Sequence, residues 1–208
     1  MSNWSMIMAT VEMPFSPSCE RNQEVILAVL KSIIKPADKH LLEIGSGTGQ
    51  HSVFMAPHFP QVQWQTSDLI DNHSGINMRL ADAKNNNILV PIVYESGNSD
   101  FPDIDVDVVF TANTLHIMSW QNVKSLIAQL GENLKSGARI IIYGPFNYNG
   151  EFTSESNAQF DEWLKEQEQH RGIRDFETVV KTMENAGMIL VEDFEMPANN
   201  RILYFVKS

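Results

Sequence analysis

Apolar and polar positions along the 208-residue chain follow two periods, one typical of helices and one typical of buried strands. From Cys19 to about Ile34 the apolar residues recur at helical spacing, and Pro36 ends this run. Short and almost uninterrupted apolar runs follow, which is typical of strands covered on both faces. Because helical and strand-like runs alternate along the chain, the pattern predicts an α/β fold with a mainly parallel sheet.

The parallel series is expected to contain five strands, and a terminal pair of strands completes the sheet. The five strands are predicted at 41–44, 62–67, 88–94, 106–112 and 139–143, with helices at 48–58, 71–84, 120–134, 153–170 and 175–187. The last two strands, 188–196 and 201–206, are connected by the four residues 197–200. A connection this short permits only antiparallel pairing. The prediction is therefore a seven-stranded sheet, mostly parallel with its last strand antiparallel, and helices on both faces.

The first strand runs directly into a segment with glycine at alternate positions, 45–49. Glycine lets the backbone turn tightly and approach a ligand without obstruction by a Cβ atom. The spacing differs from the G-x-G-x-x-G pattern of dinucleotide-binding folds, whose third glycine serves helix packing beneath a pyrophosphate. We interpret the segment as a nucleotide loop that binds no phosphate. The expected ligand contacts are Gly45, Ser46, Gly47, Thr48 and Gly49.

An acidic residue stands on each side of this loop. Glu43 lies inside the strand, where an unpaired charge is costly, so it requires a cationic or donor-rich partner. Asp68 ends the next strand, where an acidic side chain can accept both ribose hydroxyls. The acid-x-G-x-G-x-G pattern followed by an acid resembles the cofactor site of class I S-adenosylmethionine-dependent methyltransferases. The resemblance implies that Glu43 and Asp68 hold the amino acid and sugar ends of S-adenosylmethionine.

Further polar residues are expected where the strands end, because open parallel sheets bind ligands at the carboxyl ends of their strands. Glu95 closes the third strand and is a candidate for the adenine side, although the loop after it also fits a solvated turn. Asn113 and His116 follow the fourth strand, and Tyr143 ends the fifth. These side chains are the candidates for contact with the cofactor and the reacting centre.

Arg21 and Asn22 open the first helix, and two interpretations of them stay open. In the first, they face the cofactor or the substrate. In the second, the helix only covers the sheet.

Six segments narrow the resemblance to one family. They are Phe15–Asn22, Asn113–Met118, Tyr143–Asn147, Ser154–Asn157, Gly172–Asp175 and Met196–Asn200. Together they resemble a family of small methyltransferase-like proteins that is classed as a domain of unknown function and is found in bacteria and animals. The resemblance implies the class I fold and S-adenosylmethionine as cofactor, but no established substrate. Glu95 departs from the family, whose members tend to have aspartate there.

Methyl transfer from S-adenosylmethionine requires few chemical groups from the protein. The methyl group is already activated, so the protein chiefly holds the acceptor in line and excludes water. A base is needed only for an acceptor that is protonated, and His116, with an expected pKa near neutrality, is the first candidate, with Tyr143 the weaker one. His116 could instead orient Asn113 or pack under the cofactor. Asn113 lacks the Pro-Pro-aromatic continuation of enzymes that methylate amide or amino nitrogens, so those acceptors are disfavoured.

Composition restricts the partners and the compartment. A net charge of -11 and a pI near 4.9 argue against nucleic acid as the main partner. The single cysteine excludes an intramolecular disulfide, and no spacing of cysteine and histidine predicts a metal site. Without a signal peptide or an apolar run of roughly 20 residues, we expect a cytoplasmic protein that does not span a membrane. Residues 1–208 are expected to form one domain, with 1–18 a flexible or lid-like segment, and a homodimer is one open oligomeric state.

Two other conspicuous side chains are given structural roles. Trp163 is expected in the core or in a lid rather than in a stacking platform. Arg174 is expected in a surface ion pair, with a substrate carboxylate as the alternative partner.

Three functions stay open from the sequence. The first is a methyltransferase that acts on an unidentified small molecule. The second is a catalytically silent module that binds S-adenosylmethionine and works through a protein partner. The third is a nicotinamide-dependent oxidoreductase, which the terminal strand pair and the glycine spacing disfavour.

Overall fold

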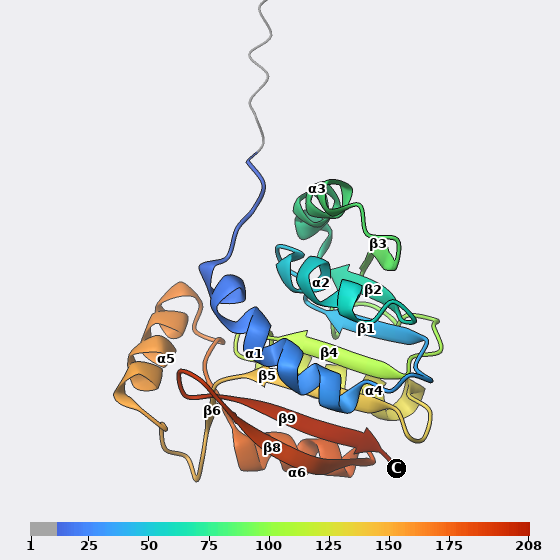
Figure 1. Cartoon of the computed structure of the whole chain (residues 1–208). Coiled ribbons are helices and arrows are strands. Elements are labelled where there is room, and N and C mark those ends of the chain that lie inside the picture. Colours follow the sequence, from blue (N-terminus) through green and yellow to red (C-terminus); the bar gives the residue numbers. More distant parts are fainter. Residues whose placement is uncertain (1–11) are drawn as a thin grey trace, which may run out of the picture.

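The computed structural model describes residues 12–208, and the first eleven residues, which hold most of the expected lid segment, lie outside this range. Seven strands form one sheet, in the spatial order β3-β2-β1-β4-β5-β9-β8 (Figure 1). They are β1 (His40–Ile44), β2 (Gln63–Asp68), β3 (Ile88–Val93), β4 (Val108–Ala112), β5 (Arg139–Gly144), β8 (Met188–Met196) and β9 (Asn200–Lys207). The strands β1 to β5 are parallel, and β9 is antiparallel to both of its neighbours, which confirms the predicted sheet.

Six α-helices accompany the sheet in the described part of the chain. They are α1 (Pro17–Ile33), α2 (Gln50–Met55), α3 (His73–Ala83), α4 (Trp120–Asn133), α5 (Glu155–Gln167) and α6 (Phe176–Asn185). Ser119, Ser154 and Asp175 begin α4, α5 and α6, and each side chain accepts a hydrogen bond from the backbone N–H three residues later. These caps satisfy amides that the first helical turn leaves unpaired.

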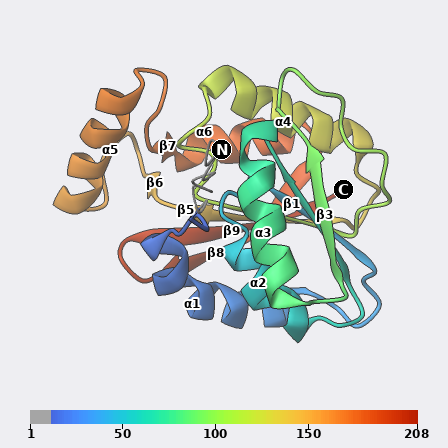
Figure 2. The same cartoon turned by 90° about the horizontal axis from the view of Figure 1, so that it is seen from above.

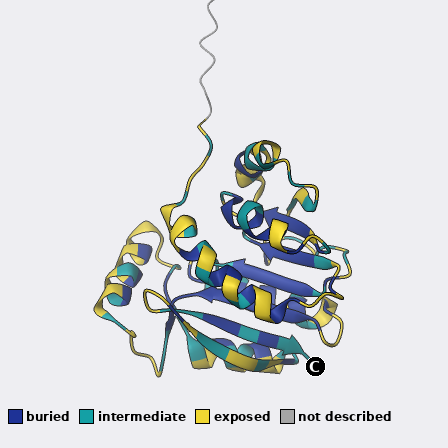
Figure 3. Ribbon diagram, in the orientation of Figure 1, coloured by how far each residue is buried: buried dark blue, intermediate teal, exposed yellow. Residues whose placement is uncertain are grey.

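Alternate residues of the strands build two apolar cores, one on each face of the sheet. Leu41 packs with α1 and α2, whereas its neighbour Leu42 packs with α4 and α6. The strands in the middle of the sheet are buried throughout, and the exposed residues lie on the outer helices and at the sheet edges (Figure 3). Seen from above, α5 stands beside the sheet rather than on either face (Figure 2).

Two helices differ in detail from the sequence predictions. Pro17 and Ser18 already belong to α1, so the N-terminal segment is shorter than expected. The helix after the glycine loop changes at Ala56 into a short 3-10 helix, η1 (Ala56–His58), because Pro57 has no N–H to donate to the carbonyl of Val53. Asn85 donates to that carbonyl instead, at 3.3 Å.

A second, two-stranded sheet was not predicted. It pairs β6 (Phe146–Asn147) with β7 (Arg174–Asp175) in parallel. Another short 3-10 helix, η2 (Ile70–Asn72), precedes α3. Strands of two residues carry no periodic pattern, so the sequence does not reveal them.

A buried ion pair joins the connection between α1 and β1 to the start of β5. The guanidinium of Arg139 contacts the carboxylate of Asp38, and each side chain is 5% exposed. Arg139 also donates to the carbonyl oxygen of Ile33 at 3.3 Å. The pair thus fixes the C-terminal end of the helix whose other end reaches the site described below.

We expect Asp38→Ala to lower the free energy of unfolding by about 3–5 kcal/mol, because it leaves the buried charge of Arg139 without a partner. Asp105→Ala is the matched control, since Asp105 pairs with Lys135 at 2.8 Å but its side chain is 74% exposed. Such exposed pairs contribute up to about 1 kcal/mol. Urea unfolding measures both variants, and equal losses would contradict the assignment.

Candidate functional site

The glycine loop has the tight turns that its sequence predicts. Gly45, Gly47 and Gly49 all have positive φ angles, of 71°, 57° and 73°. A Cβ atom on Gly45 would lie 2.8 Å from the hydroxyl of Thr114, so a larger residue would collide with the segment that follows β4. The amides of Gly45 and Ser46 both donate to the carbonyl oxygen of Ser67 at 3.0 Å. These bonds fix the loop to the end of β2.

Asp68 stands at the end of β2 and faces the loop. Its Oδ2 accepts a hydrogen bond from the amide of Gly47 at 2.6 Å, and its Oδ1 accepts from the amide of Leu69 and from Asn72 at 2.7 Å. A Cβ atom built on Gly47 would meet nothing within 4 Å, so the space beside the loop is open. The carboxylate therefore lies where a ligand on the glycine loop would meet it.

The carboxyl group of Glu43 lies beneath the loop. It accepts hydrogen bonds from the hydroxyl of Ser52 and, at 2.7 Å, from the indole N–H of Trp64. The residue is 2% exposed, and this burial raises the pKa of its carboxyl to about 7. The donor-rich surroundings match the sequence expectation. However, the structure does not bring Glu43 and Asp68 to a shared cavity, because only Asp68 lines it.

The loop opens into a cavity of about 1520 Å³ whose other wall includes residues of α5. Most of the residues that the sequence singled out line this cavity: Arg21, Asn22, Gly45, Ser46, Gly47, Thr48, Asp68, Glu95, Asn113, His116 and Tyr143. Gly49 does not line it and is the N-cap residue of α2. Glu95 is exposed and accepts a hydrogen bond from Asn98 at 2.7 Å.

Asn113 and Gly144 bring the ends of β4 and β5 close together. Asn113 has a φ of 58°, a left-handed conformation that asparagine tolerates better than most residues. The backbone N–H of Asn113 donates to the carbonyl oxygen of Tyr143 at 2.9 Å. A Cβ atom on Gly144 would lie 3.7 Å from Nδ1 of His116 and 3.9 Å from Oδ1 of Asn113. Two polar side chains thus meet above a bare stretch of backbone.

His116 is 5% exposed, and its ring meets the ring of Phe160 edge-on with centroids 5.3 Å apart. Burial lowers the pKa of the imidazole to about 4, and the nearby Arg174 and Arg171 act in the same direction. This differs from the near-neutral pKa expected from the sequence. The ring is therefore neutral at pH 7 and is a weak base.

A polar chain lines the part of the cavity next to α1. Nε2 of His51 lies 2.7 Å from Oδ1 of Asn22, so this nitrogen carries the proton. Burial lowers the pKa of His51 to about 4, which keeps its ring neutral. Burial also raises the pKa of the Tyr143 hydroxyl, an effect that contact with Asn22 partly offsets. Tyr143 consequently keeps its proton at pH 7.

Arg174 takes neither of the roles expected for it. Its guanidinium donates to three backbone carbonyl oxygens, those of Leu115, Met118 and His170. It thereby fixes the segment between β4 and α4, which carries His116. Arg174 is a positioning residue.

The residues of the cavity wall that the sequence did not reveal include His51, Phe160, Trp163 and Arg171. Trp163 is 50% exposed, so it is not in the core, and its ring stacks on that of Phe160. Their spacing of three on α5 places both rings on one face of the helix. That spacing was the only available signal, and by itself it does not distinguish a cavity wall from a core.

A family model described as "Protein of unknown function (DUF938)" matches residues 13–207. The chain belongs to the DUF938 family. Solved structures similar to this DUF938 chain include an O-methyltransferase family protein from Burkholderia thailandensis, with a TM-score of 0.79, 14% identity, and coverage of 92% of this chain and 57% of that chain. The human N-acetylserotonin methyltransferase, solved in complex with S-adenosylmethionine, has a TM-score of 0.76, 13% identity, and coverage of 92% and 53%.

The mitomycin 7-O-methyltransferase gives a TM-score of 0.77 at 14% identity, with coverage of 90% of the DUF938 chain and 54% of that enzyme. The chain thus spans little more than half of the length of each of these proteins. The likenesses show that this DUF938 protein has the fold of S-adenosylmethionine-dependent methyltransferases.

Within residues 12–208, no group of three or more histidine, cysteine, aspartate or glutamate side chains is arranged to hold a metal ion. No helix in this range is long and apolar enough to cross a membrane.

We expect Glu43→Gln to become more stable relative to the native protein as the pH rises. The unfolded chain releases the Glu43 proton near pH 4.5 and the folded protein near pH 7, so the native protein alone loses stability between these values. The difference amounts to roughly 3 kcal/mol, at about 1.4 kcal/mol for each pKa unit. Urea unfolding of both proteins at about pH 5 and about pH 8 measures it. Glu132→Gln, at an exposed position of α4, is the control and should track the native protein.

We expect the His116 ring to remain neutral until the pH falls to about 4. A titration of the imidazole Cε1–H signals by NMR measures this, with His116→Asn to assign the signal. Because Arg171 contributes to the low pKa, Arg171→Gln should shift the transition upward. A native transition near the ordinary value of 6.5 would show that the ring is solvated.

Proposed function

We propose that this protein is an S-adenosylmethionine-dependent methyltransferase that acts on a small-molecule acceptor. One observation carries the proposal. The glycine loop and the carboxylate of Asp68 line one part of a cavity, and the same cavity is lined by polar side chains from the ends of β4 and β5.

The residues of the cavity fit the methyl donor by their chemistry. Asp68 still has one free acceptor position for a ribose hydroxyl, on Oδ2, since a carboxylate has about four lone-pair sites and three are used. Glu95 can accept from the adenine amino group. Arg21 supplies a cation and Asn22 an amide for the charged amino acid end. Glu43 is left out of this set because it bonds only within the protein.

Bound S-adenosylmethionine supplies an activated methyl group on a positively charged sulfur. The lone pair of the acceptor atom forms the new bond to the methyl carbon while the carbon–sulfur bond breaks, and the electrons of that bond stay on sulfur. The protein orients the acceptor and excludes water, which is an effect of proximity. His116 is a weak base, so an acceptor that is already deprotonated, or that loses its proton easily, suits this site best.

The size of the cavity favours an enzyme over a silent binding module. Pockets for one ligand usually measure roughly 300–1,000 Å³, whereas this cavity measures about 1520 Å³. It can therefore take a donor and an acceptor together. The acidic net charge of -11 favours the alternative, a silent module, because an acidic surface would suit a basic protein partner.

S-adenosylhomocysteine at about 100 times its dissociation constant should stabilise the protein by roughly 2.7 kcal/mol, whereas NAD should not. Asp68→Asn should weaken S-adenosylhomocysteine about 10- to 100-fold, because it removes charged acceptor positions. Glu43→Gln is the matched control: its side-chain oxygen can still accept from Ser52 and Trp64, so the support beneath the loop persists and the affinity should stay nearly unchanged. Thermal shift and calorimetric titration measure these effects.

A thermal shift with NAD and none with S-adenosylhomocysteine would overturn the proposal. An equal loss of affinity in Asp68→Asn and Glu43→Gln would show that Glu43 also contributes to binding of the cofactor. Incubation of the protein with methyl-labelled S-adenosylmethionine and a metabolite extract then distinguishes an enzyme from a silent module, because only an enzyme transfers the label.

A further inference from the structure

We infer that the methyl acceptor is a small planar aromatic molecule with a negatively charged group. The ring lies against the aromatic side chains of α5, and the negative group pairs with Arg171. This inference rests on the proposed function and names the class of substrate for the same cavity.

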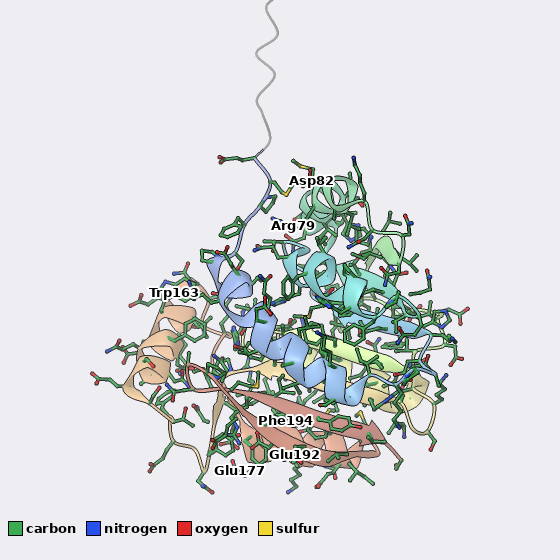
Figure 4. All side chains as sticks on the ribbon, in the orientation of Figure 1. Arg79, Asp82, Trp163, Glu177, Glu192 and Phe194 are labelled. Atoms are coloured by element: carbon green, nitrogen blue, oxygen red, sulfur yellow. The ribbon has the colours of Figure 1, made fainter. Side chains whose placement is uncertain are left out.

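The first support is an aromatic wall that the core does not need. Trp163 is 50% exposed although it is large and apolar, and it lines the cavity. Its ring stacks on Phe160 with centroids 5.8 Å apart and an interplanar angle of 14°. Figure 4 marks Trp163 on α5, the helix that stands beside the sheet. Two nearly parallel rings at the edge of a cavity offer a flat apolar surface, against which a planar ring packs well.

The imidazole of His116 extends this wall into the protein. Its ring meets Phe160 edge-on, at 79° between the planes. His116 also adjoins Asn113 across Gly144, at the ends of β4 and β5. The aromatic wall is therefore continuous with the polar groups that lie nearest to the expected methyl group.

The second support is a guanidinium with spare donors. Arg171 lines the cavity, and its Nη2 donates to Glu168 at 2.7 Å. Its Nε is buried and has no hydrogen-bond partner among the residues that the structure describes. A guanidinium has five N–H groups and binds carboxylates through two parallel hydrogen bonds. Since the side chain of Glu168 is 50% exposed, it is a weakly fixed partner that a ligand carboxylate can join or replace.

The third support is the separation of charge along the cavity. Asp68 and Glu95 lie at the end where the nucleoside is expected, so that end suits hydroxyl and amino donors. At the other end, Arg171 and Arg174 both lie close enough to His116 to lower the pKa of its ring. Arg174 already donates to three carbonyl oxygens, so Arg171 is the cation with donors to offer. Its ion-pair partner Glu168 also lines this end but is 50% exposed, so an anionic ligand competes with that carboxylate for the guanidinium.

Benzoate, benzamide and cyclohexanecarboxylate are the probes that test this inference. Benzamide keeps the ring of benzoate and lacks the charge, whereas cyclohexanecarboxylate keeps the charge and lacks the flat ring. Calorimetric titration into protein saturated with S-adenosylhomocysteine should show benzoate binding about tenfold more tightly than benzamide. Benzoate should also bind roughly fivefold more tightly than cyclohexanecarboxylate.

Three variants assign the effect to the named residues. Arg171→Gln should abolish the preference for benzoate over benzamide, and Arg171→Lys should restore part of it. Trp163→Leu should abolish the preference for the flat ring. Arg201→Gln is the control, because Arg201 is similarly exposed and paired with carboxylates but does not line the cavity. Circular dichroism and the S-adenosylhomocysteine affinity of each variant show that it is folded.

Equal affinities for benzoate and benzamide would overturn the inference, as would an unchanged preference in Arg171→Gln or an equal loss in Arg201→Gln. Failure of the inference is distinct from failure of the proposed function. Protein that binds S-adenosylhomocysteine but not benzoate refutes only the acceptor class. Protein that does not bind S-adenosylhomocysteine refutes the methyltransferase itself.

Discussion

The buried carboxyl group of Glu43 joins three elements directly beneath the glycine loop. It extends from β1 and accepts hydrogen bonds from Ser52 on α2 and from Trp64 on β2. A carboxyl group in so dry a place is costly unless its partners are fixed, so these bonds hold the loop between strand and helix in one arrangement. The open backbone of Gly47 and the position of Asp68 both depend on that arrangement. The loop that these hydrogen bonds support is part of the cavity wall.

The regular part of the fold could be predicted from the sequence, and the far wall of the cavity could not. Apolar runs and glycines are local signals, so they indicated the strands, most of the helices and the loop. The role of Glu43 was less accessible, because the sequence shows a residue's place in a strand but not what its side chain contacts. Phe160 and Arg171 belong to segments that follow the fifth strand, and only the folded chain brings them opposite Asn113 and His116.

Burial decides which groups of the site carry charge. His51 and His116 are neutral at pH 7 because burial lowers the pKa of each ring, and burial moves the pKa of Tyr143 still further above pH 7. Asp68 and Arg171 lie at different parts of the cavity and make hydrogen bonds that suit charged groups. The cavity therefore has two chemically different ends joined by uncharged, hydrogen-bonding side chains.

The helix α5 supplies one wall of the cavity and, among residues 12–208, contributes no residue to the two apolar clusters on the faces of the sheet, although its Leu164 is fully buried. Substitutions at Phe160 or Trp163, which line the cavity, can therefore alter the pocket while the sheet and its covering helices keep their packing. The residues of this wall are separate from those that pack against the sheet. Such a division allows descendants of one scaffold to exchange ligands by changing a single helix.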